Sequence, residues 1–120
     1  MAAEFVFDLL NSEPISGPGG SIRPMSVDEV PSLAGEGVAY TLFTIEPCGI
    51  NLPHLHPRAT EFIYLIRGDM VRTAFVGENG EGAAVNDLSA GMATFFPQGK
   101  PYPRTCTLAS SNTKRLFLCV

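Results

Sequence analysis

The sequence predicts an all-β domain. Its 120 residues are enough for a single core, and its 45% of hydrophobic residues, 12 glycines and 10 prolines are typical of short strands joined by tight turns. Runs of β-branched and aromatic residues recur between turn signals, and no stretch has the pattern of a long helix. We therefore expect an antiparallel sandwich or barrel of about seven strands.

Each expected strand is a short apolar run bounded by glycine, proline or polar turn residues. Val38 to Ile45 is the clearest of them, and Asn79-Gly80 is a strong signal for a hairpin turn. The expected strands, in chain order, are Phe5–Leu10, Val38–Ile45, Phe62–Ile66, Met70–Val76, Ala83–Val85, Met92–Phe96 and Leu116–Val120.

Turns are expected between the first strands. Residues 11–20 form a connector rich in proline and glycine. Ser26 to Pro31 fits a single helical turn, because Ser26 is a good N-cap residue and Glu29 completes a capping box. Any helix there is short, since the segment ends at a proline.

Charge and cysteine content argue against several classes of protein. The formal net charge of −4 argues against nucleic acids and anionic membranes as partners. No apolar run is long enough to cross a bilayer, and the N-terminal residues lack the basic start of a signal peptide. Taken at face value, the sequence predicts a cytosolic protein. The three cysteines contain no C-x-x-C pair and do not indicate a disulfide framework or a zinc cluster.

Both histidines of the chain lie in one segment, where His54 and His56 are separated by one residue and Glu61 follows. In an extended segment from Leu52 to His56, the two imidazoles point to the same side. A reversed neighbouring strand would then return the carboxylate opposite them. Two imidazoles and one carboxylate form an incomplete shell for a divalent transition metal, with coordination positions left open. A surface loop that contains these residues by chance is the alternative.

The composition changes after residue 99. Residues 100–120 contain four of the eight basic residues and no acidic residue. Pro101 and Pro103 are incompatible with a central strand across that point. We interpret residues 1–99 as the folded domain and residues 100–120 as an atypical basic C-terminal tail. An ordinary basic edge segment is the alternative.

The histidine segment resembles the first motif of the cupin superfamily, and within it the motif of germin-like and fungal spherulin-like proteins. That motif has a glycine, five residues, His-x-His, a glutamate and a second glycine. Here Cys48 takes the place of the first glycine, and His54, His56, Glu61 and Gly68 follow at fitting intervals.

The second cupin motif is only partly matched. Gly91, Pro97 and Gly99 fit it, but Tyr102 stands where the motif has its histidine and Cys106 where it has its asparagine. The resemblance extends from about Phe5 to Gly99 and ends where the composition changes.

The resemblance implies a cupin double-stranded β-helix, or jelly-roll barrel, that is incomplete at the C-terminus. It also implies that His54, His56 and Glu61 bind one metal ion, with manganese expected first and iron, nickel or zinc as other divalent ions. The family's fourth ligand is missing, and a neutral tyrosine such as Tyr102 is a poor replacement. Members of the family further suggest a secreted homo-oligomer acting on a small carboxylate or an oxygen species.

Three functions remain open at this point. The first is a germin-type cupin with manganese and with oxidase or superoxide-dismutase chemistry. The second is a non-catalytic, spherulin-like storage or stress protein with a vestigial metal site. The third is a truncated or aberrantly spliced product in which residues 100–120 are incidental. No other nucleophile or acid–base group of residues is evident, because the chain has no further histidine.

Overall fold

The computed structural model describes residues 5–54, 56–76, 83–98, 104–109 and 115–119. These residues form β-strands and one short 3-10 helix, Pro31–Leu33. No helix in this part of the chain is long and apolar enough to span a membrane. The strands are β1 (Ile15–Gly17), β2 (Gly20–Met25), β3 (Tyr40–Ile45), β4 (Ile50–His54), β5 (Glu61–Arg67), β6 (Val71–Val76), β7 (Ala83–Leu88), β8 (Ala93–Phe96), β9 (Arg104–Ala109) and β10 (Arg115–Cys119).

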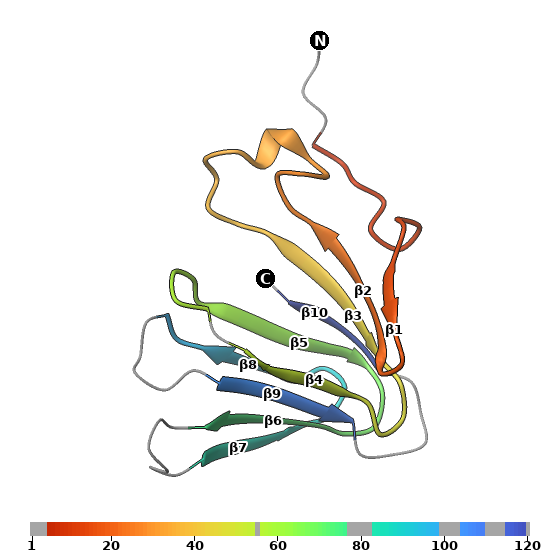
Figure 1. The fold of residues 1–120 in the computed structure, drawn as a ribbon, viewed down its shortest axis with the longest axis vertical. Helices are drawn as coiled ribbons and strands as arrows, with labels where there is room; N and C mark the ends of the chain where they lie inside the picture. The colour runs from red at the N-terminus through yellow and green to blue at the C-terminus, as the bar shows by residue number, and fades with distance from the viewer. Residues whose placement is uncertain (1–4, 55, 77–82, 99–103, 110–114, 120) are drawn as a thin grey trace.

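The strands form two antiparallel sheets, as the all-β prediction required (Figure 1). The larger sheet has the order β1-β2-β3-β10-β5-β8, and the smaller has the order β4-β9-β6-β7. Strands that follow one another in the chain often lie in different sheets, so the chain crosses between the two layers several times. This exchange between two packed sheets is the jelly-roll arrangement expected from the sequence.

The expected strands β3, β5, β6, β7, β8 and β10 are confirmed within a few residues. The strand expected at Phe5–Leu10 is wrong. Phe5 and Val6 are largely exposed, and the chain turns at Asp8, whose Oδ1 accepts a hydrogen bond of 3.2 Å from the backbone N–H of Asn11. The prediction failed because these apolar residues have no sheet face on which to be buried.

The connector expected at residues 11–20 contains a hairpin instead. β1 pairs with the start of β2, with Gly17 opposite Gly20. All three residues of β1 are exposed, so no alternation of buried and exposed positions marked them as a strand. Backbone pairing alone makes this segment a strand.

The carboxylate half of the capping box expected at Ser26 is present. One carboxylate oxygen of Glu29, Oε2, accepts hydrogen bonds from the backbone N–H of Ser26 at 2.8 Å and from its hydroxyl at 2.7 Å. These hydrogen bonds lower the pKa of the Glu29 carboxyl. The chain makes a turn here, and the regular 3-10 helix begins at Pro31, where the helical turn was expected to end.

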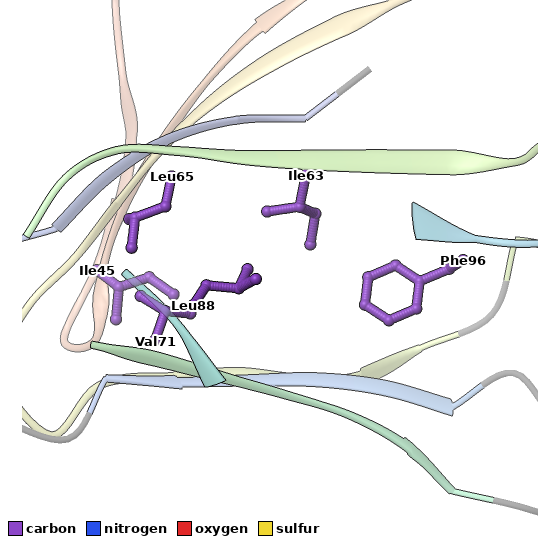
Figure 2. Packing of buried hydrophobic residues seen from close by; sticks show 6 residues of the cluster. All are labelled: Ile45, Ile63, Leu65, Val71, Leu88 and Phe96. Carbon is purple, nitrogen blue, oxygen red and sulfur yellow. The ribbon is translucent and has the colours of Figure 1, made fainter. Parts of the chain in front are cut away.

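The core lies between the two sheets. Along β5, Glu61, Ile63 and Leu65 are buried while the residues between them are exposed, which is the pattern of a strand with one face on the core. Figure 2 shows the core side chains filling the space between the layers. The buried hydrophobic cluster consists of Ile45, Ile63, Leu65, Val71, Leu88 and Phe96.

Both strands that follow residue 99 lie inside the sheets. β9 pairs with β4 on one side and β6 on the other, and β10 pairs with β3 and β5. The alternative of an edge segment does not fit these two strand backbones, since each has a neighbour on both sides. The division of the chain at residue 99 stays a prediction, because residues 99–103 lie outside the described residues.

A turn from Glu46 to Gly49 leads into the histidine segment, and its geometry favours glycine at the third residue of the turn, which is Cys48. The N–H of Gly49 donates to the carbonyl of Glu46 at 2.8 Å, with Pro47 and Cys48 between them. Cys48 has a φ of 59°. Proline at the second position and a positive φ at the third are features of a type II turn, in which glycine avoids a steric penalty at the third position.

Replacing Leu65 with alanine should lower the free energy of unfolding by about 2–5 kcal/mol, because its fully buried side chain would leave a cavity in the core. Chemical denaturation measures the change. Leu10→Ala, the same substitution at an exposed position, is the matched control. Similar losses for the two variants would contradict the assignment of Leu65 to the core.

Cys48→Gly should raise the free energy of unfolding by about 0.5–1 kcal/mol, since glycine adopts a positive φ without steric penalty but loses more chain entropy on folding. Cys48→Ala serves as the control, because it removes the thiol and keeps the Cβ. Thermal denaturation under reducing conditions compares the three proteins. An equal gain in the alanine variant would show that the thiol, and not the backbone, is responsible.

Candidate metal centre

The three predicted ligand residues come from both sheets. His54 is the last residue of β4, and Glu61 is the first residue of β5. β4 belongs to the smaller sheet and β5 to the larger, so the short connection that contains His56 crosses from one layer to the other. The sequence led us to expect the carboxylate on a reversed neighbouring strand; in the structure it comes from the opposite layer, on a strand that is not paired with β4.

The crossing brings the three side chains together. One ligand atom from each of His54, His56 and Glu61 can be chosen so that all three lie within 4.8 Å of one another. The Nε2 of His56 is 3.2 Å from the Oε2 of Glu61. The two imidazole rings have centroids 4.7 Å apart and planes inclined by 79°. The two side chains therefore approach edge to face, and both nitrogen donors remain close to the carboxylate.

One nitrogen of His54 has a defined role. Its Nδ1 is 2.8 Å from the carbonyl oxygen of Leu52. A carbonyl can only accept a hydrogen bond, so this contact requires a proton on Nδ1. In the neutral ring the lone pair is then on Nε2. A histidine that ligates a metal is commonly oriented in this way, by a hydrogen bond from its other nitrogen to a backbone carbonyl.

Glu61 is buried, with only 5% of its surface exposed. It stands opposite Phe96 in the pairing of β5 with β8, and Ile63 is the next inward-facing residue of its strand. Removing a carboxylate from water is costly unless a positive charge or hydrogen-bond donors compensate for it. The Nε2 of His56 lies 3.2 Å from the Oε2 of Glu61 and is itself buried.

The donor set fits a divalent cation. Ligand atoms about 2.1 Å from an octahedral ion are about 3.0 Å apart when adjacent and about 4.2 Å apart when opposite. The 3.2 Å between His56 and Glu61 matches an adjacent pair, and the 4.8 Å limit requires only a small movement of a side chain. The buried Nε2 of His56 has no hydrogen bond in the described part of the structure, and an ion would occupy its lone pair.

A cavity of about 360 Å³ lies beside this cluster. It is lined by two of the predicted ligands, His56 and Glu61, and by small and hydroxyl-bearing residues of the segments that approach them. The other lining residues are Gly37, Val38, Ala39, Thr41, Ala59, Thr60 and Phe62. None of these residues was predicted to line a site, because small, apolar and hydroxyl-bearing side chains carry no sequence signal of a binding site.

The β4–β5 connection is also tied to the end of β8. The hydroxyl of Thr60 accepts a hydrogen bond of 3.2 Å from the backbone N–H of Gln98, 38 positions along the chain. This contact places the last part of the second motif beside the first. Tyr102, which stands at the family's histidine position, lies outside the described residues. Cys106 lies in β9, with its backbone opposite Ala74.

Comparison with known proteins agrees with the motifs and the fold. The family model described as Cupin matches residues 7–113, which is most of the chain. The chain belongs to the cupin family. The match continues past Gly99 into β9, beyond the end of the resemblance noted in the sequence.

Two groups of relatives place this cupin among spherulin-like and germin-like proteins. Spherulin-1A of Physarum polycephalum is 45% identical over 98 residues, covering 80% of this chain and 39% of the relative. Germin-like protein 4-1 of Oryza sativa subsp. japonica is 33% identical over 89 residues, covering 71% and 35%. The chain thus spans less than half the length of these relatives.

Solved structures with the same fold include oxalate decarboxylase of Bacillus subtilis. A mutant of that enzyme superposes with a TM-score of 0.80 at 24% sequence identity, covering 99% of this chain and 29% of the other. Another structure, from work on the Mn(II) centres of the enzyme, gives a TM-score of 0.82 at 22% identity and covers 30% of that chain. At this level of identity the likeness shows the fold alone.

If the cluster of His54, His56 and Glu61 holds a divalent ion, Glu61→Gln should weaken binding of Mn²⁺ by about 100-fold or more, because it removes the anionic member of the cluster. Titration calorimetry measures the affinity. Asp87→Asn is the matched control: Asp87 is an exposed carboxylate paired with Arg72 at 2.8 Å, away from the histidines. Equal affinities of the two variants would contradict the assignment of Glu61 to the site.

Proposed function

We propose that this protein is a germin-like cupin that binds one divalent metal ion, manganese in the first place, through His54, His56 and Glu61. The observation that carries the proposal is the convergence of their ligand atoms within 4.8 Å, with a buried carboxylate among them. Iron, nickel and zinc also bind imidazole and carboxylate ligands, so the donor set by itself does not select manganese.

The reaction proposed for this site is of the oxidase or superoxide-dismutase type. A bound manganese ion would supply redox chemistry and an open position for an oxygen species or a small carboxylate. The chain's own contribution is to hold the ligands: the Leu52 carbonyl fixes the proton of His54 on Nδ1, and the burial of Glu61 keeps water from its carboxylate. The cavity beside His56 and Glu61 has room for a small substrate.

Two further properties belong to this proposal. The protein self-associates, and it acts outside the cell, as the resemblance to germin-like proteins implies. Their tests are independent of the metal: the mass of the protein in solution for the first, and detection in the medium of expressing cells for the second.

A non-catalytic, spherulin-like storage or stress protein is the second candidate. The 45% identity to Spherulin-1A supports it, and so does the substitution of Tyr102 for the second-motif histidine. In this case the metal site is vestigial. The third alternative, in which residues 100–120 are incidental, is less well supported, because strands β9 and β10 are paired on both sides.

Purified protein supplied with excess Mn²⁺ should contain about one metal ion per chain, since one set of converging ligands is present. Elemental analysis measures the metal, and thermal denaturation should show a higher Tm with metal than after chelation. Protein with no bound metal would contradict the first candidate. One ion per chain with no oxidase or dismutase activity would favour the second.

A further inference from the structure

A second cavity lies at the edge of the larger sheet that β1 and β2 form (Figure 1). Its volume is about 310 Å³, and it lies between these strands, β3 and the first residues of β4. Ile22, Phe43 and Ile45 line it from the larger sheet, and Ile50 and Asn51 line it from β4. None of the three candidate metal ligands lines this cavity, so it is separate from the candidate metal centre.

The strand register shows which residues of the larger sheet face this cavity. Phe43 packs against the core cluster, to which Ile45 belongs, so both side chains lie on the inner face of β3. Ile22 stands opposite Phe43, and Gly20 stands opposite Ile45. Residues directly opposite one another share a face of the sheet, so Ile22 and Gly20 also face inward. The same holds for Gly17, which stands opposite Gly20.

Two glycines leave part of the cavity floor without side chains. Gly17 and Gly20 are directly opposed on β1 and β2, and both line the cavity. A Cβ added at Gly17 would meet no atom of the described residues within 4 Å, apart from its chain neighbours, so the space beside it is open. Glycine within a strand commonly marks a place where a ligand or another backbone approaches closely. The bare backbone makes this floor flat, and a flat ring fits against it better than a puckered one.

Asn51 is the polar side chain of β4 that faces this floor. It stands opposite Thr107 of β9, which in turn stands opposite the fully buried Thr73 of β6. Asn51 therefore lies on the same inward face of the smaller sheet as Thr73. The side chain of Asn51 is partly buried, and its amide makes no hydrogen bond within the part of the chain that the structure describes. An amide in such a place has donors and an acceptor to offer to a ligand.

The lining of the cavity limits the kind of ligand that fits. No described residue that lines it carries a charge. An ionised group placed there would lose its water without gaining a counter-charge, which is costly. An apolar ring can be buried against Ile22 and Phe43, and a polar group at its edge can reach the Asn51 amide. A volume of about 310 Å³ lies at the lower end of the range for small-molecule sites.

We infer that this second cavity binds an uncharged, planar ring that carries an amide group. The ring lies on the backbone of Gly17 and Gly20, between the apolar side chains of the two sheets. Its amide pairs with the amide of Asn51, the donor of each facing the acceptor of the other. The inference is independent of the proposed metal function, because the residues that carry it are not metal ligands.

Benzamide is the probe that tests the inference. Benzoate replaces its amide by a charged group, and cyclohexanecarboxamide replaces its flat ring by a puckered one. Titration followed by heteronuclear NMR gives the affinity for each compound and the residues whose signals it shifts. Benzamide should bind with a dissociation constant of about 1 mM, as expected for so small a molecule, and should shift the amide signals of Gly17, Gly20 and Asn51. Benzoate should bind about tenfold more weakly or less, and cyclohexanecarboxamide should also bind more weakly than benzamide.

Gly17→Val and Asn51→Leu should each weaken benzamide binding about tenfold or more. The first substitution fills the open space beside the floor at a position without a positive φ, and the second removes the amide at similar size. Ala93→Val and Asn86→Leu make the matching changes at exposed strand positions away from the cavity. These two controls should bind benzamide as the wild-type protein does.

Absence of binding at about 10 mM benzamide overturns the inference, and so does equal affinity for benzoate. Benzamide binding that is unchanged in Gly17→Val or Asn51→Leu also overturns it. Chelation of metal should leave the affinity for benzamide unchanged. Shifts confined to the signals of His54 and Glu61 would assign the probe to the candidate metal centre and overturn the inference. Protein that binds benzamide but no metal would contradict the proposed function and leave this second site standing.

Discussion

A buried carboxylate next to the apolar core is the constraint on which this end of the structure depends. Glu61 lies on the same inward face of β5 as Ile63 and opposite Phe96, both members of the core cluster. An ionised carboxylate in such a place costs several kcal/mol unless a positive charge is near. The Nε2 of His56 lies 3.2 Å away, and a divalent ion held between the two residues would supply positive charge. The proposed metal binding would therefore be linked to the stability of the fold at this residue.

The strands after residue 99 pair with the two strands on which His54 and Glu61 lie. β9 pairs with β4, which ends at His54, and β10 pairs with β5, which begins at Glu61. The two halves of the candidate site lie in different sheets, and each half is hydrogen-bonded to one of these late strands. The convergence of the candidate ligands thus depends on residues 100–120, the region whose composition differs from that of the rest of the chain. Their pairing also explains how a segment without acidic residues can occupy the interior of a sheet, since backbone hydrogen bonds do not depend on side-chain charge.

The sequence predicted those elements whose burial leaves a pattern in the residues. β5 was found because Phe62 to Ile66 is a continuous apolar run that ends at a turn signal, and the candidate ligands were found because His-x-His is a compact motif. β1, β2 and β9 were missed; the three residues of β1 are all exposed and show no alternation, and β1 is a strand through its pairing with β2. At Phe5–Leu10 the opposite error occurred, since apolar residues that remain exposed resemble a strand. The cavity was invisible in the sequence, because its lining comes from segments that only the fold brings together.

The charge of the ligand set suggests which small molecules the site would favour. Two neutral imidazoles and one carboxylate offset one of the two charges of a divalent ion, so the proposed complex would keep one positive charge. In a partly enclosed cavity that charge attracts anions more strongly than it does in bulk water, because the local dielectric is lower. Small carboxylates and superoxide are both anions, and both are small enough for about 360 Å³. The proposed complex would keep the same net positive charge if a fourth, neutral protein ligand were added to the three. The substitution at Tyr102 therefore bears on affinity for the metal more than on the sign of the charge offered to a substrate.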